Sequence, residues 1–122
     1  MYIALFSPTG GTRKAAEIIG RAIDPQAVEI DLSKTQAEGL PLELGHDEVL
    51  LAAVPVFGGR VPAIAIERLK GITGHDTPAI PVVVYGNRDY DDALLELKSA
   101  LESNGFRPVA GIACIAEHLS LI

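Results

Sequence analysis

The chain has 122 residues, 48% of them hydrophobic, and its 10 basic and 16 acidic residues give a formal net charge of −6. This length predicts one domain over residues 1–122 with a sizeable apolar core. The negative charge disfavours nucleic acid and anionic membrane surfaces as partners, and a single cysteine, Cys114, excludes an internal disulfide.

No apolar run approaches the roughly 20 residues of a transmembrane helix. The first strand is expected to start at Tyr2, so no signal peptide is expected before it. A lone cysteine fits a reducing compartment. Together these features predict a cytoplasmic protein without a membrane partner.

The first third of the chain predicts a strand, a helix and a second strand. An apolar run predicts a strand over residues 2–6, and apolar residues at helical spacing predict a helix over 12–23. Pro25 disfavours helical backbone at Asp24, so the helix should end there. The short alternating stretch 27–31 is typical of a strand at a sheet edge.

The remainder continues the alternation after an irregular connection. Residues 32–47 carry no helical or strand period, only a turn around residues 38–41. The later elements are expected as a central strand at 48–54, a helix at 63–71, a strand at 79–85, a helix at 90–103 and a strand at 106–116. Alternating strands and helices predict an α/β fold with a parallel sheet and right-handed crossovers.

Ligands in such sheets bind at the carboxyl ends of the strands. The loops after the first, third and fourth strands share that edge and are rich in glycine and polar residues. This coincidence predicts one ligand site built from three loops.

The first of these loops, Ser7-Pro8-Thr9-Gly10-Gly11-Thr12, lies at a strand-to-helix junction. Its hydroxyls and backbone N–H groups can converge on an anion at the positive end of the helix dipole, which predicts a phosphate site. The spacing matches neither the Walker nor the GxGxxG pattern. The alternative is an ordinary capped turn with Thr12 as the N-cap residue.

The other two loops carry aromatic residues. Phe57 follows the third strand, and Tyr85 and Tyr90 lie at and beyond the end of the fourth. Phe57 and Tyr90 could bracket a planar heterocycle by stacking. A phosphate at one end and a flat ring at the other describe a mononucleotide.

The three loops together resemble those of a known protein family. The first loop resembles the Ser/Thr-x-Thr-Gly-x-Thr loop of flavodoxins, and residues 55–62 and 84–94 are most similar to flavodoxin-like domains fused to ferredoxin-type iron–sulfur modules. Glu117-His118 also matches that group. The resemblance covers nearly the whole chain and implies a doubly wound, five-stranded parallel sheet of order 2-1-3-4-5.

The resemblance also implies FMN as the cofactor and assigns residues to it. Phosphate would be held by Ser7, Thr9 and Thr12 with the amides of Gly10 and Gly11. Phe57 and Tyr90 would flank the isoalloxazine ring, and the peptide of Gly58 would turn to accept a hydrogen bond from the reduced flavin. The full predicted site is Ser7, Thr9, Gly10, Gly11, Thr12, Pro55, Val56, Phe57, Gly58, Tyr85, Gly86, Asn87, Arg88 and Tyr90.

The sequence departs from the family pattern in several places. Phe57 stands where many flavodoxins carry Trp, and Asn87 stands where Asp is common. No cysteine cluster is present for iron–sulfur ligation, and the chain ends before the final helix of the fold. Without that helix we expect an exposed apolar patch over residues 49–54 and 82–84, and hence self-association or a partner that covers it.

Three functions fit this reading. The first is an FMN electron carrier between redox partner proteins, among them a ferredoxin-type iron–sulfur module. The second is an FMN-dependent NAD(P)H or quinone-type reductase, and the third is an interaction module that no longer binds flavin. No catalytic residue is assigned, because no nucleophile–base pair stands out, and the three histidines have no metal-ligand spacing.

Several charged and polar residues keep open roles. Arg13 and Lys14 could meet the phosphate or face solvent, since basic side chains in the first turn oppose the helix dipole. Arg60 and Arg88 are expected at the surface beside the site. Cys114 is expected as a small core residue.

Overall fold

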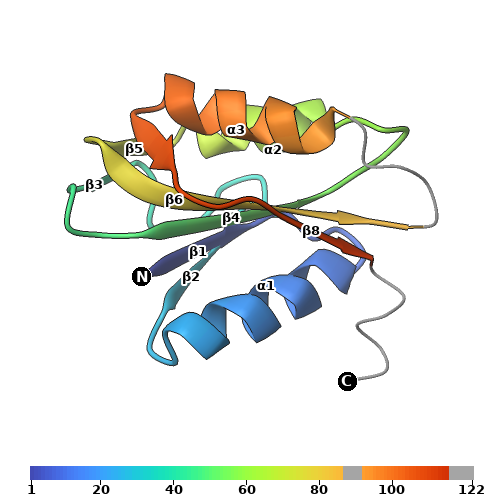
Figure 1. Cartoon of the computed structure of the whole chain (residues 1–122), viewed down its shortest axis with the longest axis horizontal. Helices are drawn as coiled ribbons and strands as arrows, with labels where there is room; N and C mark the ends of the chain where they lie inside the picture. Colours follow the sequence, from blue (N-terminus) through green and yellow to red (C-terminus); the bar gives the residue numbers. More distant parts are fainter. Residues whose placement is uncertain (87–91, 116–122) are drawn as a thin grey trace.

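The computed structural model describes residues 1–86 and 92–115 of the chain (Figure 1). Its elements in chain order are β1 (Tyr2–Leu5), α1 (Gly11–Ile23), β2 (Val28–Asp31), β3 (Leu42–Leu44), β4 (Leu50–Pro55), α2 (Ala63–Leu69), β5 (Ile72–Gly74), β6 (Thr77–Tyr85), α3 (Ala93–Ser103), β7 (Phe106–Pro108) and β8 (Ile112–Ile115).

The main sheet has the order β2-β1-β4-β6-β7, with β8 also paired to β6, and all its pairs are parallel. The predicted order 2-1-3-4-5 is therefore confirmed, with β4, β6 and the pair β7–β8 as the third, fourth and fifth strands. The predicted edge position of β2 is confirmed too. Figure 1 shows α1 on one face of the sheet and α2 and α3 on the other, as right-handed crossovers require.

The core forms two apolar layers because neighbouring strand residues point to opposite faces. Every residue of β4 is buried. On the α1 face, Leu51 and Val82 pack with Ala15 and Ala16 of the helix. On the face of α2 and α3, buried side chains of the same strands pack with Leu97.

The expected apolar patch over the central strands was wrong. Residues 50–54 and 82–84 are at most 4% exposed. The helix α1 lies against β1, β4 and β6, and it lies close because Gly20 leaves no side chain over Ile3; a Cβ atom there would come within 2.4 Å of Ile3 Cδ1. The half-buried apolar side chains on this face include Ile80 near the start of β6 and Ile112 of β8. The central strands thus do not supply the surface on which the expected self-association rested.

The fifth strand is split in two where the prediction had one strand over 106–116. Between the paired segments, β6 has residues 80–81 while the partner has residues 109–111, one more. The Ala79 carbonyl accepts a hydrogen bond from the Val109 N–H at 2.9 Å. The odd-numbered residues of β6 therefore direct their backbone N–H and C=O groups toward the fifth strand. Pro81 faces it as well but has no N–H to donate, which interrupts the ladder at this point.

A second, two-stranded sheet joins β3 to β5 and was not predicted. It lies at the end of the molecule opposite the loops after β1, β4 and β6 (Figure 1). Each strand has three residues, too few for a period to be visible in the sequence. The residues before it remain irregular, as expected.

Candidate functional site

Figure 1 shows the carboxyl ends of β1, β4 and β6 at the same end of the sheet. The parallel register places the carboxyl ends of these three adjacent strands side by side. The predicted meeting of the three loops is therefore confirmed as far as the structure describes them. Asn87, Arg88 and Tyr90 lie outside the described residues, as do Glu117 and His118, and their roles stay predictions.

The first loop leads directly into α1, which begins at Gly11 with Gly10 as the N-cap residue. Thr12 is the second helical residue, so its alternative role as the N-cap was wrong. The cap comes from outside the helix, because the Ser7 hydroxyl oxygen accepts a hydrogen bond from the Arg13 N–H at 2.9 Å. The Ser7 hydroxyl still has its own hydrogen to donate to an anion.

The junction leaves polar groups available for a ligand. Thr12 is 4% exposed, yet its hydroxyl makes no hydrogen bond within the described part of the chain. The N–H groups of a first helical turn have no intrahelical partner. A Cβ atom on Gly10 or Gly11 would meet no heavy atom of the described residues within 4 Å. Open space in front of these donors fits a phosphate group.

The side chain of Arg13 does not face this junction, nor is it simply solvated. It donates to Glu29 Oε1 at 2.5 Å and to Asp31 Oδ2 at 3.0 Å on β2. Partial burial raises the pKa of Asp31, but hydrogen bonds from Ser33 and the charge of Arg13 outweigh it and lower this pKa. These carboxylates explain how a basic residue is tolerated in the first turn of α1.

Ser33 belongs to the same junction and was missed by sequence reasoning. Its hydroxyl oxygen accepts a hydrogen bond from the Ser7 N–H at 2.6 Å, and its own N–H donates to Asp31 Oδ1 at 2.9 Å. The strand order contained the signal: β2 lies beside β1, so the residue after β2 must lie near the residue after β1.

The second loop forms a tight hairpin after β4. Phe57 and Arg60 exchange backbone hydrogen bonds of 2.9 and 3.1 Å. Gly58 and Gly59 between them have φ values of 61° and 79°, which match a type I′ turn, a conformation that favours glycine and asparagine. Phe57 is 53% exposed, so its ring is available to cover a ligand.

The base of this hairpin is tied to the neighbouring strand. Pro55 ends β4, and the Val56 N–H donates to the Val84 carbonyl at 3.0 Å. Arg60 lies at the surface as expected, with its side chain 71% exposed and paired to Glu96 of α3.

The third loop is described only at its start. Tyr85 ends β6 and is half-buried, and Gly86 follows it. A Cβ atom on Gly86 would also have no heavy atom of the described residues within 4 Å. Each of the three loops therefore has at least one described glycine that borders open space: Gly10 and Gly11, Gly58, and Gly86.

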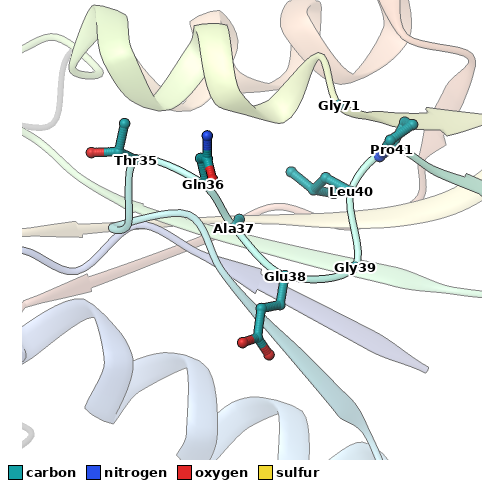
Figure 2. Close-up of a pocket in the computed structure, with 8 residues that line it drawn as sticks. All are labelled: Thr35, Gln36, Ala37, Glu38, Gly39, Leu40, Pro41 and Gly71. Atoms are coloured by element: carbon teal, nitrogen blue, oxygen red, sulfur yellow. The ribbon is translucent and has the colours of Figure 1, made fainter.

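A separate open pocket of about 620 Å³ lies between the segment after β2 and the end of α2. Residues 35–41 and Gly71 line it (Figure 2). Glu38 points away from α2, on the opposite side of the segment from Thr35 and Gln36. None of the predicted site residues line this pocket, and its own lining offers no pair of groups suited to chemistry.

Other kinds of site find no support in the described residues. They include no group of three metal-ligating side chains. In the same part of the chain, every helix is too short or too polar to cross a bilayer. Cys114 is half-buried on β8, and burial raises the pKa of its thiol, so it is not an activated nucleophile.

No protein-family model and no curated protein matches the sequence. Solved structures do match, at low identity. A flavodoxin from Streptococcus pneumoniae is 15% identical with a TM-score of 0.65, covering 98% of this chain and 92% of that one. A flavoprotein from Lactobacillus acidophilus, solved in complex with FMN, is 14% identical with a TM-score of 0.63, covering 98% and 95%.

The same fold also occurs within a longer chain. The Flv1 flavodiiron core from Synechocystis is 16% identical with a TM-score of 0.64, covering 99% of this chain and 33% of that one. At these identities the likeness establishes the flavodoxin fold.

Proposed function

We propose that this chain binds FMN at the shared edge of the three loops and acts as a redox carrier. One observation carries the proposal: at the start of α1 the Thr12 hydroxyl has no hydrogen-bond partner among the described residues, and a Cβ atom on Gly10 or Gly11 would meet open space. The exposed ring of Phe57 lies at the same edge of the sheet. The FMN complex of the Lactobacillus acidophilus flavoprotein, which has the same fold, supports the choice of ligand.

In this proposal the first loop holds the phosphate. The hydroxyls of Ser7, Thr9 and Thr12 donate to its oxygens, together with the N–H groups of Gly10 and Gly11. Ser33 orients the start of the loop through the Ser7 N–H. Because the Arg13 guanidinium is engaged by Glu29 and Asp31, the donors in this proposal are hydroxyl and N–H groups, supported by the helix dipole.

The second and third loops hold the ring. Phe57 covers one face of the isoalloxazine, and the backbone of Gly58 meets its polar edge. Pro55, Val56, Tyr85 and Gly86 complete the described wall, and Asn87, Arg88 and Tyr90 are proposed to close it.

Bound FMN would supply the redox chemistry by accepting and releasing one or two electrons. The protein excludes water from one ring face and sets the hydrogen bonds at the ring edge. The net charge of −6 would disfavour additional negative charge on the bound group. Redox partner proteins would exchange the electrons, and a ferredoxin-type iron–sulfur module is the first partner to try.

A flavin titration tests the proposal directly. Adding the protein to FMN, riboflavin and FAD should quench flavin fluorescence, with FMN bound most tightly. A protein that binds none of the three would be an interaction module that has lost the cofactor. Rapid NAD(P)H oxidation with a quinone by the FMN-loaded protein would assign the reductase function instead.

A further inference from the structure

Glu96 makes a contact that the proposed site does not yet explain. Its carboxylate accepts hydrogen bonds from Arg60 Nε at 3.2 Å and from Arg60 Nη2 at 2.7 Å. The same Oε1 atom accepts a third hydrogen bond, from the Val61 N–H at 3.0 Å. A two-point guanidinium–carboxylate contact fixes both position and orientation.

This contact joins the second loop of the site to the start of α3, the helix after the third loop. Arg60 closes the hairpin that carries Phe57 and Gly58. Glu96 lies in the first turn of α3. Among the described residues, every hydrogen bond from residues 57–61 to another element ends on Glu96.

The hairpin depends on this contact for its position. The backbone bonds between Phe57 and Arg60 set its shape, but they do not hold it against the rest of the molecule. Its first side is tied to β6 by the Val56 N–H. Its second side is tied by Glu96 and by the buried side chain of Val61. Removing the carboxylate would leave the second side held by the packing of Val61 alone, with no hydrogen bond to the Arg60 guanidinium.

We infer that Glu96 is a positioning residue that holds the Phe57–Arg60 hairpin at a set distance from the start of α3, and so against the flavin ring. This inference rests on the proposed function, because it concerns the ring of the bound flavin. Glu96 itself does not touch the ligand in this account. It acts through Arg60 and the Val61 N–H.

The test compares Glu96 with a matched residue on the same helix. Glu102 is exposed, and its side chain has no hydrogen bond or ion pair with any described residue, so Glu102→Ala and Glu102→Gln reproduce the change in charge alone. For Glu96→Ala we expect the affinities for FMN and for riboflavin to fall by the same factor, about three- to tenfold. A tenfold loss corresponds to about 1.4 kcal/mol of binding free energy. Equal losses are expected because the hairpin meets the ring and not the phosphate.

The midpoint potentials distinguish positioning from a general loss of stability. Glu96→Ala should shift at least one of the two one-electron midpoints of bound FMN, and Glu102→Ala should shift neither. Glu96→Gln keeps an oxygen for the Val61 N–H but loses the ion pair, so its shift should be intermediate. Arg60→Lys, which keeps the charge without the two-point geometry, should shift the potentials in the same direction as Glu96→Ala.

Amide hydrogen exchange, measured without flavin, separates a local loosening of the hairpin from a general folding defect. Amide hydrogen exchange at Val61 should accelerate in Glu96→Ala and stay unchanged in Glu102→Ala, while amides of β4 keep their protection in both. Equal potentials and equal Val61 exchange in the Glu96 and Glu102 variants would overturn the positioning role. A wild-type protein that binds no flavin would instead overturn the proposed function. The hydrogen-exchange comparison would then still show whether Glu96 holds the hairpin in the flavin-free protein.

Discussion

The guanidinium of Arg13 on α1 bridges two acidic residues of β2, with Nη1 2.5 Å from Glu29 Oε1 and Nη2 3.0 Å from Asp31 Oδ2. The bridge turns the side chain of Arg13 toward the edge strand. It therefore separates two properties of the junction: the helix start is stabilised by charge pairs, while the proposed phosphate contacts are neutral.

Arg13→Gln should lower stability and leave FMN affinity within about threefold of wild type, because the side chain faces β2 and not the phosphate. Partly exposed ion pairs of this kind contribute about 0.5–1 kcal/mol. Arg107→Gln is the control, since Arg107 also pairs with a carboxylate, that of Asp76, and lies beside the start of β6, away from the three loops. Urea unfolding and a flavin titration check both parts, and a large, selective loss of FMN binding in Arg13→Gln would place the guanidinium on the phosphate.

Stability should fall as pH drops from about 5 toward 3, partly through Asp31. The pKa of Asp31 is lower in the folded chain than its ordinary value. Its stabilising contribution is therefore present above the unfolded pKa and is lost as pH falls through the folded pKa. Asp31→Asn should flatten the dependence of the melting temperature on pH in this range. An unchanged slope would show that the contacts with Ser33 and Arg13 do not favour the charged form.

Thr12→Ala should weaken FMN binding more than riboflavin binding. A hydrogen bond to a charged group contributes about 1.5–3 kcal/mol, and only FMN carries the phosphate. Thr9→Ala should act in the same direction. Thr73→Ala, at an exposed position of β5, is the control for a lost threonine hydroxyl. Equal losses for FMN and riboflavin would show that this loop does not hold the phosphate.

Gly58→Val should destabilise the hairpin and alter the first one-electron reduction of bound FMN. Gly58 has a φ of 61°, and a left-handed conformation costs a residue with a side chain about 1–2 kcal/mol. A Cβ atom there would meet no described heavy atom within 4 Å, so backbone strain is the expected cause. Gly58→Asn should be milder, since Asn tolerates this region. Identical stepwise potentials in wild type and Gly58→Val would contradict a role for this peptide at the ring.

Much of the architecture was readable from the sequence because it is written in local patterns. Apolar runs and helical spacing identified the strands of the main sheet and the helices beside it, and their alternation implied that the sheet is parallel. The strand order came from the resemblance to flavodoxins. Residues 7–12 were recognisable as a loop before a helix N-terminus. Because the carboxyl ends of parallel strands meet at one edge of the sheet, the sequence also predicts that this loop lies near Phe57 and Tyr85.

The tertiary structure decided what depends on residues far apart in the chain. The partners of Arg13 and Ser7 lie on and just after β2, and those of Arg60 lie on α3, so no local period reveals them. The break opposite Pro81 required the register of β6, and the pairing of β3 with β5 joins strands too short to show a pattern. Burial of the central strands was misjudged for the same reason, because it depends on how closely α1 packs over Ile3.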